Sequence, residues 1–593
     1  MTLISDRKLD LLKLNSLITT GGANCTSEKA CLEGTRVHAL NNICTWIHGG
    51  GPQCDARLLL LLGQAGVGKS AIAHSIAHIF KDAKRLGASF CFANDRGTEN
   101  FFRTIARGIA DVDPSYALAL TDAIDSTNAS TPSHSDQITE LLIDPLQSLS
   151  LVGPLVIVID ALDECKTARD VIVDVLARNM HKIPPNIRFI VTSRPSEAKI
   201  LRSYNWVSVY DLEDEPAAQQ DILAFVKEQL REPGSESRLK GFRSRDLEAI
   251  AASADGLFQY AAVVCKEILN SRKNREAPTK VFKRLVRPGS CSLDTLYALI
   301  LSNAYNVRLS NPNPDTEGLE TFRSVLGWIL AASTRLTHQA LIDFGLCAWP
   351  MSADSTSESD TSSDYQPEEG FDAVSNTLRP LGALLSGTQE LSATVYPLHS
   401  SVRDFLLDES RSGCFYIGPL TQHHVLLASV SLQIMDRDLH FNMINLKSSY
   451  VPNSDIPDLQ ARLDAHVSVA LFYACRYWFS HLKGSMLDEH QFDGVSRIRS
   501  MAGKKFLFWL EVLGLRQCTY HAQQAFEYLY QWLQVRSSDG FYCARAASWP
   551  PPPSWPLVVL PVSVTVYTYN NVSIQYVYLL PICHRFFRVE IQI

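Results

Sequence analysis

The sequence predicts an α/β fold with a parallel sheet, followed by a long helical region. Short apolar runs alternate with amphipathic stretches over the first third of the chain, a pattern typical of successive βαβ units. After about Glu213 the strand signal fades and helical periodicity takes over. With 593 residues, of which 46% are hydrophobic, the chain is long enough for about three to five globular units.

Five short segments are the predicted strands. They are 58–62 (LLLLL), 88–92 (ASFCF), 154–160 (PLVIVID), 187–193 (IRFIVTS) and 206–212 (WVSVYDL). Continuous apolar runs of this length are expected for parallel strands that are buried on both faces, joined by right-handed crossovers.

Amphipathic helices are predicted between and after these strands. A helix over 35–47 is expected to bury Val37, Leu40, Ile43 and Ile47, and the helix after residue 69 to bury Ile72, Ile76, Ile79 and Phe80. Phe102, Ile105 and Ile109 mark a third helix, and the stretches 217–230 and 246–269 predict two more. Helical patterns continue to about residue 345 and resume after an acidic, Ser-rich insert at 352–369.

Two low-complexity segments stand apart from this pattern. The insert 352–369 is interpreted as a solvated loop, with a phosphorylation-tuned switch as the alternative. The tail 537–593 begins with a proline-rich spacer and continues with alternating apolar residues. It predicts either a β-hairpin or translated non-coding sequence.

Charge and composition exclude several classes of protein. Lys plus Arg number 55 against 62 Asp plus Glu, so the net charge of −7 argues against nucleic acid as the partner. The 14 cysteines form no CxxC pair, and no apolar run is long enough for a membrane span. Because the first residues have no signal-peptide layout, we expect a cytoplasmic protein.

The strongest motif lies between the first predicted strand and the helix after it. It is GQAGVGKS, made of Gly63, Gln64, Ala65, Gly66, Val67, Gly68, Lys69 and Ser70, and it fits the Walker A pattern G-x-x-x-x-G-K-[ST]. Its backbone N–H groups are expected to surround phosphates at a helix N-terminus. Lys69 then reaches the β- and γ-phosphates, and Ser70 gives a hydroxyl to Mg²⁺. The alternative is a degenerate loop that binds nothing.

Two further strands end in polar residues. Asp160 closes the third predicted strand, where a Walker B carboxylate would hold Mg²⁺. Asp163 and Glu164 follow, and a catalytic pair that orients or deprotonates water is the alternative to a solvated acidic turn. Arg194, at the end of FIVTSRP, is a candidate sensor of the γ-phosphate, the alternative being a surface arginine.

These three motifs, in this order, resemble the NACHT NTPase domain of fungal NLR-like proteins, which belong to the STAND class of signal-transduction ATPases. The resemblance extends over about residues 30–530. It includes the segments CLEGTR (31–36), GASFCFANDR (87–96), ADGLFQYAAVVC (254–265) and YPLHSSVRDFLLD (396–408), and the helical stretches LFYACRYWFSHL and FLFWLEVL.

The resemblance implies a domain order. A lead-in with a linker helix (1–55) precedes a three-layer P-loop NTPase domain (56–212), a helical domain (213–290) and a winged-helix-like domain (291–415) that contains the insert. A helical region (416–536) and the tail of doubtful status (537–593) follow.

The resemblance also implies a switch. ADP would hold the nucleotide, helical and winged-helix domains closed, and exchange for ATP would open them for self-association in innate-immunity or self/non-self recognition signalling. It implies slow, Mg²⁺-dependent ATP hydrolysis, and the preference for ATP over GTP comes from it alone. The winged-helix histidine that contacts the ADP β-phosphate corresponds to His399, for which a buried structural histidine is the alternative.

Two departures from the family leave the signal and the protein partners unassigned. About 30 residues precede the resemblance, too few for an effector domain, and no C-terminal sensor repeats are visible. An ordinary P-loop ATPase or small-molecule kinase and a non-hydrolysing nucleotide-bound scaffold remain alternatives. No acceptor pocket is apparent in 90–150, and the acidic pair favours water as acceptor. A Ser–His–Asp hydrolase using His399 and Ser400 would lack the G-x-S-x-G elbow.

Overall fold

The computed structural model describes residues 29–528 with internal gaps. The gaps are 93–100, 127–137, 166–168, 232–238, 287–291, 308–316, 349–368, 448–452, 486–496 and 502–504, with residues 52, 54, 216, 240, 274, 275, 306, 457, 499 and 527. The chain divides into two compact units. The first holds Met1–Leu296 and His399–Ser401, and the second holds Tyr297–Leu398 and Val402–Ile593.

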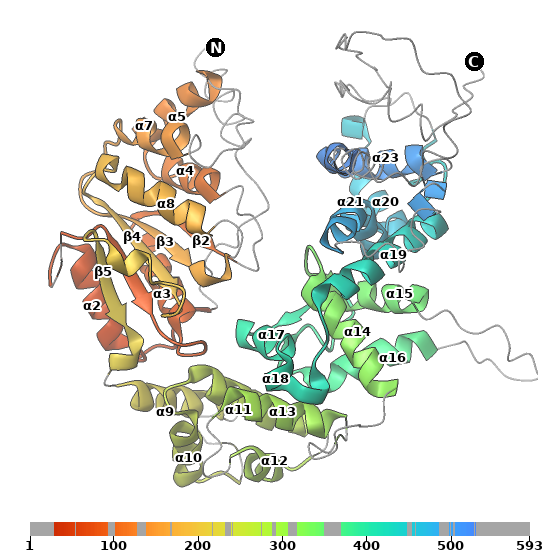
Figure 1. Ribbon diagram of the computed structural model, residues 1–593, viewed down its shortest axis with the longest axis horizontal. Coiled ribbons are helices and arrows are strands. Elements are labelled where there is room, and N and C mark those ends of the chain that lie inside the picture. The colour runs from red at the N-terminus through yellow and green to blue at the C-terminus, as the bar shows by residue number, and fades with distance from the viewer. Residues whose placement is uncertain are drawn as a thin grey trace, which may run out of the picture. The chain divides into compact units, whose positions relative to one another are not determined.

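The first unit is built on a five-stranded sheet (Figure 1). Its strands are β1 (Leu58–Leu62), β2 (Leu86–Cys91), β3 (Leu155–Asp160), β4 (Ile187–Ser193) and β5 (Val207–Asp211). They lie in the order β2-β3-β4-β1-β5, and every pair is parallel. The predicted α/β fold with a parallel sheet is therefore confirmed, with strand ends within two residues of the prediction.

Helices cover both faces of this sheet. Alternate leucines of β1 point to opposite sides, and none of the five is more than 2% exposed. One set packs in a core with α4 (Phe101–Ala110), α5 (Pro114–Ser126) and α8 (Arg169–Asn179). The other set packs in a core with α2 (Val37–Ile47) and α3 (Lys69–Asp82). The three layers explain why β1 is apolar throughout.

Two residues of the predicted helix faces lie outside the core. Val37 at the start of α2 is 50% exposed and Ile79 in α3 is 43% exposed. In α2 the buried residues are Ala39, Ile43, Trp46 and Ile47, and the apolar buried residues of α3 are Ile72, Ala73, Ile76, Ala77 and Phe80. Small alanines belong to both sets, so the buried face is rotated away from the predicted one.

The helices that follow the sheet in the first unit are α9 (Ala218–Gln229), α10 (Ser244–Ala254), α11 (Phe258–Lys273) and α12 (Pro278–Leu285). The stretch 246–269 is helical as predicted, and the structure divides it into two separate helices, α10 and α11. Asp255 and Gly256 have φ of 45° and 81°, and left-handed residues of this kind end a helix.

The second unit is largely helical, as predicted. It contains α14 (Glu317–Ala331), α15 (His338–Ala348), α16 (Glu369–Leu378), α18 (Glu409–Ser412), α19 (Leu420–Asp438), α20 (Leu459–His466), α21 (Val469–Gly484) and α23 (Phe506–Leu515). Helix α13 (Leu293–Ala304) and helix α17 (Ser400–Leu406) each have residues in both units. Three short strands, β6 (Leu336–Thr337), β7 (Leu385–Ser386) and β8 (Thr394–Pro397), form an antiparallel sheet in the order β6-β8-β7.

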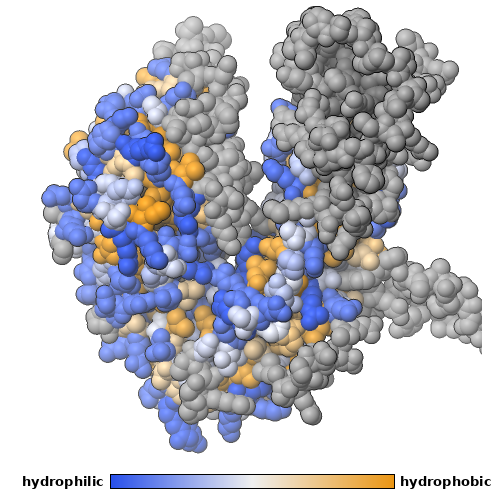
Figure 2. Space-filling model, in the orientation of Figure 1, coloured by the Kyte–Doolittle hydropathy of each residue, from blue (hydrophilic) through white to orange (hydrophobic). Residues whose placement is uncertain are grey.

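Several predictions stay untested by this architecture. The domain limits, including the winged-helix assignment, remain predictions. The tail 537–593 and all but the last residue of the insert 352–369 lie outside the described residues. Within the described part of the chain, no helix is long and apolar enough to cross a membrane. Hydrophilic residues predominate on the face of the first unit seen in Figure 2, as expected when the apolar side chains fill two cores.

Candidate functional site

The Walker A residues form a tight loop between β1 and α3. β1 ends at Leu62 and α3 begins at Lys69. Gly66 and Gly68 have φ of 92° and 99°, values that residues other than glycine rarely adopt. Gly68 is the N-cap of α3 and supplies no side-chain cap, so backbone N–H groups of the first turn are available to an anion. The loop therefore has the local structure that phosphate binding requires.

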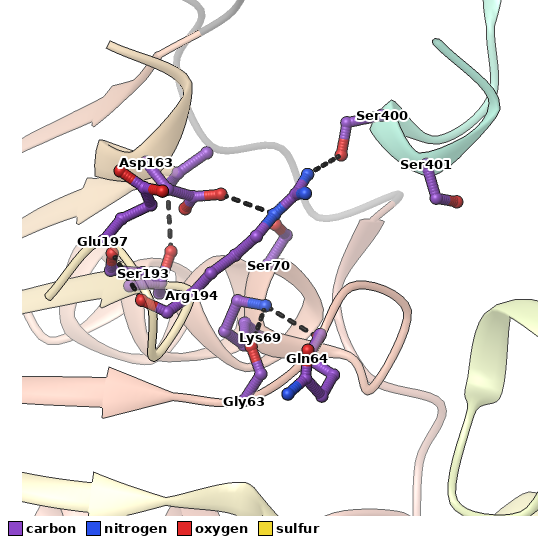
Figure 3. Close-up of polar contacts among 12 residues, drawn as sticks. Gly63, Gln64, Lys69, Ser70, Asp163, Ser193, Arg194, Glu197, Ser400 and Ser401 are labelled. Atoms are coloured by element: carbon purple, nitrogen blue, oxygen red, sulfur yellow. Dashed lines mark hydrogen bonds and ion pairs between the residues drawn. The ribbon is translucent and has the colours of Figure 1, made fainter. Parts of the chain in front are cut away.

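The Lys69 side chain folds back onto this loop. Its Nζ donates to the carbonyl oxygens of Gly63 at 2.7 Å and Gln64 at 2.9 Å (Figure 3). Burial lowers the pKa of Lys69, and the nearby carboxylate of Asp163 partly opposes that shift. An incoming phosphate would favour the charged ammonium and so raise this pKa again.

Asp160 ends β3 and is only 1% exposed. Its Oδ1 accepts hydrogen bonds from Ser70 Oγ at 3.1 Å and from Thr192 Oγ1 at 2.6 Å. Its Oδ2 accepts a longer contact of 3.5 Å from Cys91 Sγ. The ends of four parallel strands and the P-loop thus meet at one edge of the sheet, where α/β folds bind ligands.

The Ser70 hydroxyl and the Asp160 carboxylate fit a magnesium ion. Both are hard oxygen ligands, and their 3.1 Å hydrogen bond places them side by side. The described residues contain no group of three or more His, Cys, Asp or Glu side chains arranged to hold a metal. Mg²⁺ usually binds through one or two carboxylates together with phosphates and water.

The turn after β3 brings Asp163 to Arg194. Ala161 adopts a left-handed conformation with φ of 57°, and a short 3₁₀ helix spans Leu162–Glu164. The Asp163 side chain is 6% exposed, and its Oδ2 forms an ion pair with Arg194 Nε at 2.9 Å (Figure 3). Its other oxygen is buried without a hydrogen-bond partner among the described residues. Burial raises the pKa of Asp163, against the effect of Lys69 and Arg194.

Glu164 lies beside this pair. Burial, and secondly the charge of Asp163, raise the pKa of Glu164 to about 7, and the Ser400 side chain forms a hydrogen bond with it. Arg194 Nη2 also donates to Ser400 Oγ at 3.5 Å (Figure 3). The low exposure of Asp163 and the raised pKa of Glu164 differ from what a solvated acidic turn would show.

His399 precedes Ser400 in the chain, and both residues belong to the first unit. Its Nδ1 lies 2.7 Å from Ser401 Oγ and accepts the Ser401 backbone N–H at 3.1 Å. With Nδ1 accepting, a neutral ring carries its proton on Nε2, which makes Nε2 a hydrogen-bond donor. The ring lines the cavity described next, but its contact with a β-phosphate stays a prediction.

Many of these residues line one cavity of 310 Å³. This volume lies at the lower end of the range for small-molecule sites. Its lining includes the polar or charged side chains of Lys69, Ser70, Asp163, Glu164, Arg194, His399 and Ser400. It also includes the apolar side chains of Leu32, Phe225 and Phe258.

The sequence prediction missed Arg36, which lines the same cavity. This side chain is 3% exposed, its Nη2 donates to the Val67 carbonyl at 2.7 Å, and its guanidinium stacks over Phe258 at 4.9 Å. Burial lowers the pKa of Arg36, while Asp221 opposes this. Arg36 is the last residue of the CLEGTR segment, which the sequence analysis compared with the family. Only the fold shows that its side chain contacts the P-loop, at the carbonyl of Val67.

The comparisons with known proteins cover part of this site. Residues 35–194 match the family model described as Nephrocystin 3, N-terminal. The match is just over a quarter of the chain and runs from the residue before Arg36 through the P-loop and Asp160 to Arg194. No curated protein matches the chain. The matched model is not described as NACHT, so the NACHT resemblance remains a proposal, while the P-loop-like sheet is consistent with nucleotide binding.

Proposed function

We propose that this chain is a nucleotide-binding switch of the STAND type, which binds ADP and ATP with Mg²⁺ and hydrolyses ATP slowly. The observation that carries the proposal is the shared edge of the sheet, where the P-loop, Lys69 and Ser70 line one cavity and the Ser70 hydroxyl donates to Asp160 beside it. The match to the Nephrocystin 3 N-terminal family supports an NLR-like NTPase context for the same residues.

Each residue of the site has its own role in this proposal. The loop N–H groups and Lys69 bind the β- and γ-phosphates, while Ser70 and Asp160 hold Mg²⁺, which neutralises phosphate charge. Glu164 is the proposed base that takes a proton from the attacking water, because its raised pKa brings it close to neutral pH. Asp163 holds Arg194 by their ion pair, and Arg194 senses the γ-phosphate.

The proposal extends to signalling. ADP favours an inactive state, ATP an active one that self-associates, and the protein partners and triggering signal are not assigned. His399 is the proposed reporter of the β-phosphate. The competing functions differ in turnover: a scaffold retains nucleotide without hydrolysis, whereas a simple P-loop ATPase or kinase releases ADP freely in multiple turnovers.

The first test is the identity of the nucleotide that co-purifies with the protein. We expect ADP at nearly one per chain after denaturation and chromatography. ATP instead of ADP would indicate a state poor in hydrolysis, and the absence of nucleotide together with undetectable binding of added ATP and ADP would refute the proposal.

A variant of Lys69 tests the loop directly. Lys69→Ala should weaken ADP and ATP binding by about 10- to 100-fold, because hydrogen bonds to charged groups contribute about 1.5–3 kcal/mol. The fold should persist, measured by circular dichroism. Lys81→Ala is the matched control, since Lys81 is exposed at the other end of the same helix. Equal affinity of Lys69→Ala and wild type would show that the loop does not bind phosphate.

A further inference from the structure

Thr192 contacts the candidate metal carboxylate from the neighbouring strand. It is fully buried, and its Oγ1 donates to Asp160 Oδ1 at 2.6 Å. The same oxygen accepts the Ala161 backbone N–H at 2.8 Å. One hydroxyl therefore bonds both to the carboxylate and to the peptide that follows it.

The sheet register explains this position. Ile159 pairs with Val191 in β3 and β4, so Asp160 and Thr192 are the next residues along two adjacent strands. On its other side Thr192 pairs with Leu61 of β1, two residues before the P-loop begins. The residue lies between the strand that leads into the P-loop and the strand that ends at Asp160.

The hydrogen bond to Ala161 N–H also bears on the backbone. Ala161 has a φ of 57°, in the left-handed region that residues other than glycine rarely adopt. Such a conformation persists only when surrounding contacts fix it. Thr192 supplies one of these contacts and thereby fixes the turn from which Asp163 and Glu164 project.

Ser70 and Thr192 have different parts in this arrangement. Both donate to Asp160 Oδ1, but in the proposed function Ser70 is also a ligand of the cation. Thr192 also lines the cavity, but its Oγ1 bonds to both Asp160 and the Ala161 N–H, so this hydroxyl can hold Asp160 in one orientation regardless of what Ser70 binds. We propose that Thr192 is a positioning residue that presents Asp160 to the divalent cation and so sets the Mg²⁺ dependence of nucleotide binding.

This inference rests on the proposed function, and its test separates the two. The full chain is titrated with a fluorescent ADP analogue in excess EDTA and at a series of Mg²⁺ concentrations. In Thr192→Val, which keeps the shape but removes the hydroxyl, the affinity in EDTA should stay within about twofold of wild type. The Mg²⁺ concentration for half-maximal tightening should rise about tenfold, which corresponds to about 1.4 kcal/mol for the lost hydrogen bond to the carboxylate.

Two further variants make the result specific. Thr192→Ser retains the hydroxyl and should restore the Mg²⁺ response of wild type. Ser193→Ala is the matched control, because Ser193 is buried on the same strand and its Oγ donates to the Arg194 carbonyl rather than to Asp160. It should leave the Mg²⁺ response unchanged.

The opposing outcomes are distinct. An unchanged Mg²⁺ response in Thr192→Val, or an equal loss of affinity with and without Mg²⁺, would overturn the positioning role. If Thr192→Val does not fold, the same titration is made on Thr192→Val with Ala161→Gly, since glycine removes the backbone strain. A wild-type chain that binds no ADP under any condition would instead refute the proposed function.

Discussion

Replacing Glu164 by glutamine should make the protein more stable at neutral and alkaline pH. The pKa of Glu164 is raised from 4.5 to about 7, chiefly by burial. The folded state therefore binds a proton that the unfolded state has released between these pH values, and stability falls as pH rises through this window. Glutamine has a similar shape and no charge, so the variant avoids this loss.

The magnitude follows from the size of the shift. One pKa unit corresponds to about 1.36 kcal/mol, so the destabilisation caused by the raised pKa of Glu164 amounts to about 3 kcal/mol at pH 8 and about 1 kcal/mol at pH 5. For a unit of this size, about 1 kcal/mol moves the melting temperature by about 2 °C. Glu164→Gln should therefore melt about 6 °C above wild type at pH 8 and about 2 °C above it at pH 5.

Thermal unfolding of nucleotide-free protein in EDTA measures this difference, because a bound ligand would change the charge around Glu164. Glu213→Gln is the matched control, since it makes the same carboxylate-to-amide change at an exposed residue of the same unit. A Glu164→Gln variant that is less stable than wild type at pH 8, or a difference that does not grow from pH 5 to pH 8, would show that Glu164 is not held in an unfavourable environment.

Two other predictions follow from the same site. Wild-type ATP turnover, measured as phosphate release, should rise with pH as Glu164 ionises, whereas Glu164→Gln should bind ATP but turn over slowly and without this rise. An unchanged rate would move the role of base away from Glu164. Gly66→Ala should lower the melting temperature and weaken ADP binding about tenfold, because its φ is 92° and a Cβ would lie 2.9 Å from Gln259 Cβ. Gly34→Ala, with φ of 80° but no atom within 4 Å, controls for backbone strain alone, and equal effects of the two changes would contradict this explanation.

The strands could be predicted because their signal is local. β4 begins and ends at the predicted residues, since a run buried on both faces is apolar from end to end. The helix faces were harder, because Ala39 and Ala73 belong to the core while the larger Val37 and Ile79 do not. Hydrophobicity of single residues does not reveal how a helix is rotated against its sheet.

Some residues of the site could be predicted from the sequence, and others are shown only by the fold. Asp160 ends a predicted strand, Lys69 and Arg194 follow two others, and the parallel topology brings the ends of these strands to one edge. Thr192 and Arg36 act through partners 32 and 31 residues away in the chain. No sequence pattern states such a pairing, because it depends on strand register and on how α2 packs. The order β2-β3-β4-β1-β5 supplies that information for Thr192, which it places beside Asp160.

The buried charges of the site bear on how it would act as a switch. Burial lowers the pKa of Lys69 and raises those of Asp163 and Glu164, so each shift disfavours the charged form of its group. Such shifts are common at functional sites, because a fold optimised only for stability would not keep these groups. A magnesium-bound nucleotide brings both phosphate charge for Lys69 and positive charge for the carboxylates. Its binding would therefore relieve an unfavourable arrangement, and the relief should differ between ADP and ATP, whose γ-phosphate reaches the Arg194–Asp163 pair in the proposed function. That difference in binding free energy is what any nucleotide-dependent change of state requires.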